Sequence, residues 1–312
     1  MYAGAKGLFF ALSRSATLKR FASAYGMAPG GFARRFIAGE TVDEVVDTAR
    51  ALQAARFHLT LDYLGESVAS AEAARAATAE YAHVMQVIEA SGIERNISLK
   101  LTQLGLTVDR ATCVDNLRRI LDPGREHGFF VRIDMENSPV TQVTLDVFET
   151  VWEQGYRNVG VVLQSALRRS EQDVRRLNAL GARVRLVKGA YKEPASVAWQ
   201  DKADVDAAYR QLMHVLLDEG TYPAIATHDA ALITAAQAHA RSRGLAQDAY
   251  EFQMLYGIRR DLQASLVDAG YRVRLYVPFG REWFPYFMRR LGERPANVGF
   301  VLRALLHERR AA

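Results

Sequence analysis

The stretch FFVRIDMENSPVTQVTLDVFETVWEQGYRNVGVVLQ, residues 129–164, contains two short apolar runs separated by a helical segment. The runs Phe129–Asp134 and Val159–Gln164 are rich in β-branched and aromatic residues and have the length of buried strands. Between them, Val140–Gln154 carries apolar residues at helical spacing, and Gly155 follows where a helix cap favours glycine. The stretch therefore predicts a strand, a helix and a second strand in succession.

The same alternation extends to both sides of this unit, so that the chain holds eight apolar runs. The other six are Phe57–Asp62, Ile97–Leu101, Val184–Lys188, Ala224–His228, Tyr250–Leu255 and Val273–Val277. Helical segments such as 71–90, 201–219 and 230–240 lie between them, and glycines close helices at Gly92, Gly128, Gly155, Gly181, Gly220 and Gly270. Eight strand–helix repeats predict an α/β protein, a (β/α)8 barrel. A doubly wound open sheet is the alternative, but no Gly-rich strand–turn–helix fingerprint follows any of the runs.

The chain is predicted to have two regions. Residues 1–50 form an N-terminal helical arm in this interpretation, and the arm ends in the amphipathic segment Val42–Arg50. No composition break or low-complexity linker follows this segment. Residues 51–312 are therefore predicted to form the barrel together with a C-terminal helix.

The composition is that of an ordinary globular protein, with 312 residues of which 49% are hydrophobic and 24% charged. The net charge of +5 comes from dispersed basic residues, so we expect no nucleic-acid partner. The single cysteine, Cys113, excludes an intramolecular disulfide and a Cys-based zinc site, and we expect it to be buried. No apolar run approaches the roughly 18 residues of a membrane span, and Leu8–Leu12 is too short for a signal peptide. We therefore expect a cytoplasmic location.

Polar side chains stand at the ends of the predicted strands. They are Asp62, Lys100, Asp134, Gln164, Arg185 with Lys188, Thr227–His228–Asp229, and Tyr276. Active sites of such barrels lie at the carboxyl ends of the strands, where these residues gather. A lone buried charge costs several kcal/mol, so any one of these residues is explained by an ion pair, but their joint occurrence predicts a site.

The C-terminal segment carries a second polar feature. Tyr286, Arg289, Arg290 and Glu293 fall at i, i+3, i+4 and i+7, which is one face of a helix, while Phe284, Phe287, Met288 and Leu291 form the apolar side. Taken alone, such a face is either solvated or a grip for a carboxylate or phosphate. Together with Lys100 and Arg185 it indicates a small anionic substrate. A metal site is not expected, because His58 and His228 stand alone on their strands.

Six motifs resemble those of the proline dehydrogenase family, in its monofunctional bacterial form. They are Ser98–Thr102, Arg132–Glu136, Val184–Tyr191, Ala226–Asp229, Glu251–Gly257 and the segment from Tyr276 through Arg290 to Val298. The resemblance runs from about residue 57 to 303. It implies a distorted (β/α)8 TIM barrel with non-covalently bound FAD, which oxidises L-proline to Δ1-pyrroline-5-carboxylate by hydride transfer to flavin N5. It also implies that electrons pass to a membrane quinone, that the enzyme is peripheral on the inner face of the cell membrane, and that it begins proline catabolism to glutamate.

The resemblance also implies roles for individual residues. Lys100, Arg289 and Arg290 would bind the proline carboxylate, and Tyr276, Tyr286 and Leu255 would wall the ring. Arg185 and Asp134 would be catalytic, with Arg185 beside flavin N5 and Asp134 paired to Lys100 or an arginine. The FAD-binding positions would be Met135, Gln164, Arg185, Lys188, Gly189, Ala190, Thr227 and His228.

Three further points follow from the resemblance. Glu66 would pair with the first arginine and close the site as a gate, although an exposed loop acid is the alternative. Tyr276 favours L-proline, because the hydroxyproline-oxidising branch tends to have a smaller residue there. Asp229 stands where some relatives carry Asn, and it adds a negative charge near the expected FAD phosphates.

Two other functions remain open at this point. One is a flavin barrel like methylenetetrahydrofolate reductase, which would oxidise NAD(P)H, although the double-arginine helix argues against it. The other is a non-catalytic amino-acid sensor or membrane-associated scaffold on the same barrel, which would bind proline without turnover.

Overall fold

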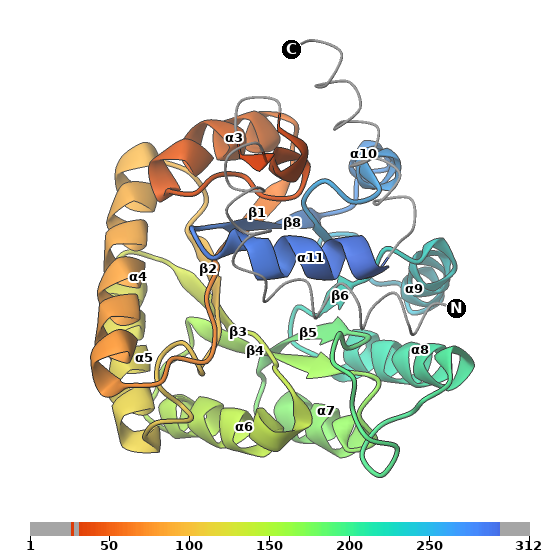
Figure 1. The fold of residues 1–312 in the computed structure, drawn as a ribbon. Helices are drawn as coiled ribbons and strands as arrows, with labels where there is room; N and C mark the ends of the chain where they lie inside the picture. The colour runs from red at the N-terminus through yellow and green to blue at the C-terminus, as the bar shows by residue number, and fades with distance from the viewer. Residues whose placement is uncertain (1–25, 28–30, 294–312) are drawn as a thin grey trace.

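A computed structural model describes residues 26–27 and 31–293 of the chain. Eight parallel strands close into a barrel in chain order, with β1 hydrogen-bonded to β8 (Figure 1). The strands are β1 (His58–Tyr63), β2 (Asn96–Leu99), β3 (Phe130–Ile133), β4 (Val159–Gln164), β5 (Arg183–Val187), β6 (Ala224–Ala226), β7 (Glu251–Leu255) and β8 (Val273–Phe279). The predicted barrel is confirmed, and the closed strand order rules out the open sheet.

A helix follows every strand, as the alternating pattern predicts. The helices are α3 (Val42–Ala54), α4 (Ala71–Ser91), α5 (Arg110–Glu126), α6 (Ser138–Glu153), α7 (Ser170–Ala179), α8 (Lys202–Glu219), α9 (Ala230–Ser242), α10 (Arg260–Asp268) and α11 (Trp283–Glu293). Figure 1 shows α4 to α10 around the outside of the barrel, whereas α11 lies in front of the strands. Helix α11, the last of the described helices, is therefore placed to cover the barrel rather than to extend its outer ring.

The core lies between the strands and the surrounding helices. Alternate strand residues such as Leu61, Ile97 and Val131 are fully buried there, because successive side chains of a strand point to opposite faces. The intervening positions carry the polar residues, which places these side chains inside the barrel. Cys113 is buried as expected, and burial raises the pKa of its thiol to about 12.

Charged side chains also close the amino end of the barrel interior. Arg274 donates to both oxygens of Glu251, at 2.9 and 3.1 Å from Nε, and to Glu94 Oε1 at 2.7 Å. Arg132 lies beside Gly160, where an added Cβ would come within 2.6 Å of the Arg132 guanidinium. An added Cβ would also lie 2.6 Å from the backbone carbonyl oxygen of Arg183, so glycine at this position of β4 leaves room for both the buried arginine and the backbone of β5.

The described part of the N-terminal region packs onto the barrel and α11. The short helix η1 (Phe32–Arg35) leads into Phe36 and Ile37, which form a second buried cluster with Trp283 and Phe287. Helix α3 spans residue 50, where the arm is predicted to end, and its buried face joins the main core. Residues 1–25 and 28–30 of the predicted arm lie outside the described residues.

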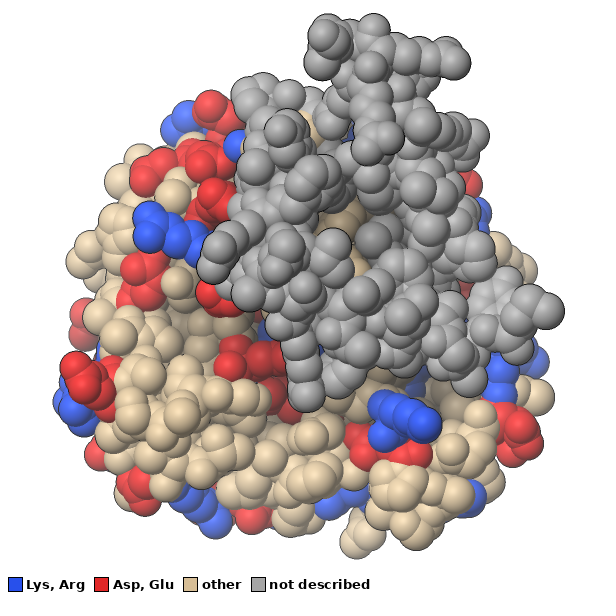
Figure 2. All heavy atoms as spheres, viewed as in Figure 1, with Lys and Arg blue, Asp and Glu red and all other residues tan. Residues whose placement is uncertain are grey.

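On the face shown in Figure 2, basic and acidic side chains are interspersed over the described surface, which shows no large patch of one charge there. Among the described helices, none combines the length and the apolar character that crossing a membrane requires.

Candidate active site

Lys100 stands at the carboxyl end of β2, between two carboxylates on the neighbouring strands. Its Nζ lies 3.4 Å from Asp62 Oδ1 and 3.5 Å from Asp134 Oδ2, and only 9% of the residue is exposed. Burial opposes its charge, but the two carboxylates outweigh burial and raise the pKa of Lys100 above its ordinary value. Burial also raises the pKa of Asp62, against the attraction of Lys100. Lys100 is therefore a fixed cation at the mouth of the barrel.

Asp134 joins Lys100 to two further side chains. Arg185 Nη1 donates to Asp134 Oδ1 at 2.8 Å, and the Tyr276 hydroxyl donates to Asp134 Oδ2 at 2.7 Å. The Arg185 guanidinium also lies 5.3 Å from the centre of the Tyr276 ring. Burial and the adjacent carboxylates raise the pKa of Tyr276 well above its usual value, so the phenol keeps its proton. Asp134 thus pairs with both Lys100 and an arginine, which are the partners expected for it.

Helix α11 brings the double arginine to this mouth. Arg289 Nη1 lies 3.3 Å from Glu66 Oε2 in the β1–α4 loop, which is the pairing expected for Glu66. Although burial opposes its charge, Glu66 raises the pKa of Arg289. The Arg290 guanidinium lies 5.0 Å from the centre of the Tyr286 ring. The side chains of Glu293, from the predicted polar face, and of Leu291, from the predicted apolar side, lie outside the described residues.

Side chains from three elements meet at the second buried cluster, which includes residues of α11. Tyr286 belongs to the buried cluster that residues of α11 form with Met27, Ala33, Phe36 and Ile37, and Leu255 and Tyr276 pack against the same cluster. These three side chains come from α11, β7 and β8, so only the folded barrel brings them together. They provide an apolar wall next to the charged group around Lys100.

A second group of predicted residues lies at the ends of β4, β5 and β6. Gln164 Nε2 donates to the Glu136 carbonyl at 2.7 Å, which ties the end of β4 to the loop that follows Asp134 and the buried Met135. Gly189 is exposed and has φ +111°, a conformation that favours glycine. Next to it in the chain, Ala190 is also exposed.

Lys188 and Asp229 form an ion pair within this group. Lys188 Nζ lies 3.0 Å from Asp229 Oδ2 and 2.5 Å from Asp206 Oδ1. Burial acts to raise the pKa of Asp229, but the hydrogen bond and charge of Lys188 lower it overall. The extra carboxylate at position 229 is thus paired with Lys188, which also pairs with Asp206. The same residue caps α9, where its Oδ1 accepts a hydrogen bond from Ala231 N.

Thr227 and His228 complete the group at the end of β6. The Thr227 hydroxyl accepts a hydrogen bond from the backbone N of Asp229 at 3.1 Å. His228 Nε2 accepts from the backbone N of Leu255 at 2.9 Å, so the neutral ring carries its proton on Nδ1.

Comparison with known proteins identifies the family of this barrel. The profile described as proline dehydrogenase matches residues 45–303. Over 299 residues the chain is 40% identical to Proline dehydrogenase 1 of Bacillus subtilis (strain 168), which covers 96% of this chain and 98% of that protein. The chain belongs to the proline dehydrogenase family. Members of this family are flavin-dependent, and the activity of the chain is the oxidation of proline to Δ1-pyrroline-5-carboxylate.

Further similarities agree with this family. Proline dehydrogenase of Deinococcus radiodurans is 42% identical over 278 residues, or 88% of this chain and 90% of that protein. The solved structure of proline utilization A (PutA) from Bdellovibrio bacteriovorus, inactivated by N-propargylglycine, superposes with a TM-score of 0.78 at 29% identity. That similarity covers 83% of this chain but 32% of the longer chain. The match to proline dehydrogenases sets aside the alternative of a methylenetetrahydrofolate reductase-like barrel.

The sequence did not indicate a role for two residues that lie close to the charged group of this proline dehydrogenase. Tyr191 follows β5, and burial together with the negative charges of Glu136 and Glu66 raises the pKa of its phenol. Glu136 accepts hydrogen bonds from Thr102 N and Thr102 Oγ1, at 3.2 and 2.6 Å, and burial raises its pKa. Both residues stand within the family motifs quoted above, but only the folded chain shows that Tyr191 neighbours Lys100 and Arg289 and that Glu136 neighbours Lys100.

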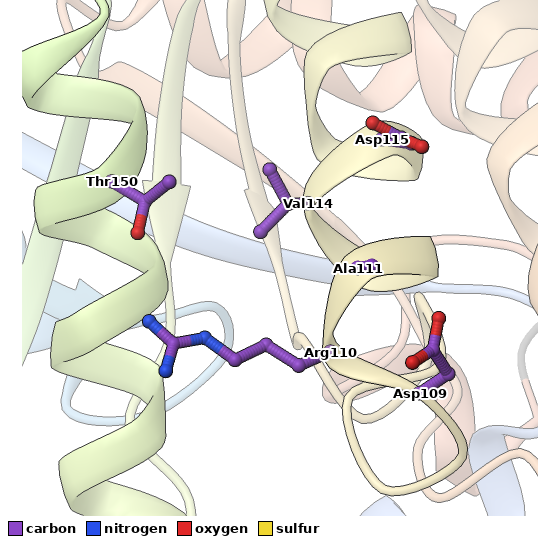
Figure 3. A pocket seen from close by; sticks show the side chains of 6 residues that line it. All are labelled: Asp109, Arg110, Ala111, Val114, Asp115 and Thr150. Atoms are coloured by element: carbon purple, nitrogen blue, oxygen red, sulfur yellow. The ribbon is translucent and has the colours of Figure 1, made fainter.

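Two other features of the described residues lie apart from this site. A shallow depression between α5 and α6 is lined by Asp109, Arg110, Ala111, Val114, Asp115 and Thr150 (Figure 3). Arg110 reaches across it from α5 toward α6, on the outside of the barrel. Within residues 26–27 and 31–293, no group of three or more His, Cys, Asp or Glu side chains is arranged to hold a metal ion.

Proposed function

We propose that this proline dehydrogenase oxidises L-proline with non-covalently bound FAD and passes the electrons to a membrane quinone. The observation that carries the proposal is the position of Lys100. It stands as a buried cation at the barrel mouth, joined through Asp134 to Arg185, beneath the helix that bears Arg289 and Arg290. An amino-acid carboxylate is the ligand that such a set of cations favours.

The substrate clamp follows from this arrangement. Lys100, Arg289 and Arg290 bind the carboxylate of L-proline, with the two arginines as fork donors and the lysine as a point charge. Glu66, which is paired with Arg289, closes the site over the bound substrate as a gate.

The apolar wall of Tyr276, Tyr286 and Leu255 excludes water from the substrate ring and limits its size. Tyr276 is fixed by its hydrogen bond to Asp134, so the wall is rigid beside the reacting carbon. A fixed wall of this kind positions the substrate, and positioning is the main contribution that a protein makes to such a reaction.

The residues present fit an FAD molecule. Arg185 Nε is buried and has no hydrogen-bond partner among the residues that the structure describes, so it is available to a ligand acceptor. Gly189 offers exposed backbone close to Gln164, and Lys188 supplies a cation beside a helix N-terminus, which suits a phosphate. We assign the cofactor to the residues that the family resemblance implies. These are Met135, Gln164, Arg185, Lys188, Gly189, Ala190, Thr227 and His228.

The chemical roles divide between the cofactor and the chain. FAD, when bound, supplies flavin N5 as the acceptor of the hydride that leaves proline C5. Arg185 holds a positive charge where the reduced ring would gain negative charge. Asp134 accepts hydrogen bonds from both Arg185 and Tyr276, and it thereby holds the guanidinium and the wall of the substrate pocket in a fixed position relative to each other.

The proposal also covers the electron acceptor and the cellular location of the protein. We infer peripheral association with the inner face of the cell membrane, where a quinone would take the electrons. Support comes from the family resemblance and from the net charge of +5, which favours an anionic lipid surface.

The proposal is tested on the purified protein. We expect it to be yellow, and we expect L-proline to bleach the visible flavin band in the absence of oxygen. Ubiquinone in lipid vesicles should then restore the band. A colourless protein that cannot be reconstituted with FAD would contradict the cofactor assignment. Binding of L-proline without bleaching would instead favour the non-catalytic sensor.

A further inference from the structure

Two buried hydroxyl groups lie next to Arg185 inside the barrel. Arg185 Nη2 donates to Ser98 Oγ on β2 at 3.0 Å, and Ser98 Oγ lies 3.0 Å from Thr60 Oγ1 on β1. Both hydroxyl-bearing residues are 0% exposed. A row of contacts therefore runs from Asp134 through Arg185 and Ser98 to Thr60.

The donor and acceptor roles in this row are constrained. A guanidinium has only donors, so Ser98 Oγ is the acceptor of the Arg185 hydrogen bond. Ser98 keeps its own hydrogen, and Thr60 Oγ1 is an oxygen within reach of it. The pair of hydroxyls thus offers Arg185 a neutral acceptor of fixed position.

This contact fixes the plane of the Arg185 guanidinium. Nη1 is held by Asp134, directly after β3, and Nη2 by Ser98 on β2, so residues from two separate strand regions hold the two arms of one planar group. A planar group held at both arms cannot rotate about the axis of its side chain. The direction of the remaining buried donor, Nε, is set by these two contacts.

We propose that Ser98 and Thr60 are positioning residues for proline oxidation, which hold the Arg185 guanidinium in its orientation at the flavin. The inference rests on the role proposed above for Arg185. A hydroxyl suits this task better than a second carboxylate, because it accepts the hydrogen bond without cancelling the charge of Arg185. One carboxylate, Asp134, already contacts this arginine.

The test compares Ser98→Ala, Thr60→Val and Thr60→Ser in the FAD-loaded enzyme. We expect Ser98→Ala to lower kcat by about tenfold or more with little change in the KM for proline, because the loss falls on the reacting state. We also expect it to shift the flavin absorbance spectrum in the direction produced by Arg185→Met. Thr60→Val should give the same changes to a smaller extent. Thr60→Ser keeps the hydroxyl, so its kcat, KM and flavin spectrum should equal those of the wild type.

A matched control removes a buried hydroxyl elsewhere. Thr78 is 6% exposed, and its Oγ1 donates to Ala74 O within α4. Thr78→Val should therefore lower the melting temperature without changing the flavin spectrum or the ratio of kcat to KM. If Ser98→Ala fails to fold, the two Thr60 variants decide the question through the same spectrum and kinetic constants.

The double variant Ser98→Ala, Arg185→Met separates the possible failures. If Ser98 acts through Arg185, the double variant should match Arg185→Met alone in kcat and spectrum. A further loss beyond Arg185→Met would overturn the positioning role. If Arg185→Met alters the spectrum and kcat but Ser98→Ala alters neither, this inference alone is overturned. Wild-type behaviour of Arg185→Met would overturn both this inference and the proposed role of Arg185.

Discussion

The charge of Lys100 depends on its neighbours more than on its own chemistry. An isolated buried lysine tends to lose its proton, because burial disfavours the charged form. Asp62 and Asp134 reverse this tendency and raise the pKa of Lys100. In the proposed clamp, the substrate carboxylate would therefore meet a permanent cation, and its affinity for Lys100 should not change with pH near neutrality.

Arg290 offers the most direct test of the clamp at the scale of single residues. We expect Arg290→Met to raise the KM for L-proline by about ten- to a hundredfold, since losing a charged hydrogen-bond partner costs about 1.5–3 kcal/mol. FAD should stay bound, because Arg290 lies on α11 and not among the assigned cofactor residues. Steady-state kinetics and flavin absorbance measure the two quantities.

Arg281→Met is the matched control for this change. Arg281 precedes α11 and is exposed, so the same substitution there removes an arginine from the same segment without touching the clamp. We expect its KM to equal that of the wild type. An Arg290→Met enzyme with an unaltered KM would exclude this arginine from substrate binding.

Among the helices, α9 shows how one residue serves both a helix and a site. Asp229 caps the N-terminus of α9 and also pairs with Lys188. Asn caps a helix about as well as Asp, whereas Ala does not. We therefore expect Asp229→Asn to keep the stability of the wild type, while Asp229→Ala loses about 1 kcal/mol of unfolding free energy.

The same pair of variants tests the cofactor assignment. Asp229→Asn removes a negative charge beside Lys188, so FAD should bind more tightly to this variant than to the wild type. Thermal unfolding of the cofactor-free protein and titration with FAD give the two readouts. Weaker FAD binding by Asp229→Asn would show that this carboxylate does not face the phosphates.

Gly257 lies against the segment before α3. It has φ +76°, and an added Cβ would lie 1.8 Å from the carbonyl oxygen of Arg35. We expect Gly257→Ala to displace this segment and to cost about 1–3 kcal/mol through overpacking, in addition to the backbone strain. Trypsin should cleave faster after Arg34 and Arg35 in the variant, and urea unfolding should report the lost stability.

Gly244→Ala separates the effect of overpacking from the effect of backbone strain. Gly244 also has a positive φ, +67°, but nothing lies within 4 Å of an added Cβ. This variant should lose only the cost of left-handed backbone, about 1–2 kcal/mol, and keep the wild-type cleavage rate at Arg34 and Arg35. Equal cleavage rates in the two variants would contradict the docking role of Gly257.

The strands and helices of the barrel were largely predictable because their signals are local. The run Val159–Gln164 matches β4 residue for residue, and the segment 71–90 differs from α4 by a single residue at its end. The contact between Ser98 and Arg185 had no such signal, because it joins residues 87 positions apart in the chain. The pairing of Glu66 with Arg289 was predicted only through the family resemblance, since no periodic pattern relates a loop to a distant helix.

Charged groups occupy both ends of the barrel interior. The active-site group occupies the carboxyl end, and Arg274 with Glu251 and Glu94 occupies the amino end. A buried ion pair is costly to form, and removing one partner leaves an uncompensated charge. The charged group at the amino end is therefore expected to make stability depend on pH, separately from the chemistry of the active site.

Glu251 allows this dependence to be measured. Burial acts to raise its pKa, but Arg274 outweighs burial and lowers the pKa of Glu251 to about 2, from 4.5 in an unfolded chain. A carboxylate with a lowered pKa stabilises the fold above its unfolded pKa, and the stabilisation is lost as the pH falls toward 2.

We expect Glu251→Gln to lower the unfolding free energy at neutral pH by about 3–5 kcal/mol, because Arg274 loses a buried partner. Between pH 4.5 and 2 the variant should lose less stability than the wild type. Urea unfolding across this range measures both effects, with the exposed Glu153→Gln on α6 as the control that should follow the wild type. Parallel pH curves for Glu251→Gln and the wild type would mean that the amino-end pair does not contribute to acid sensitivity.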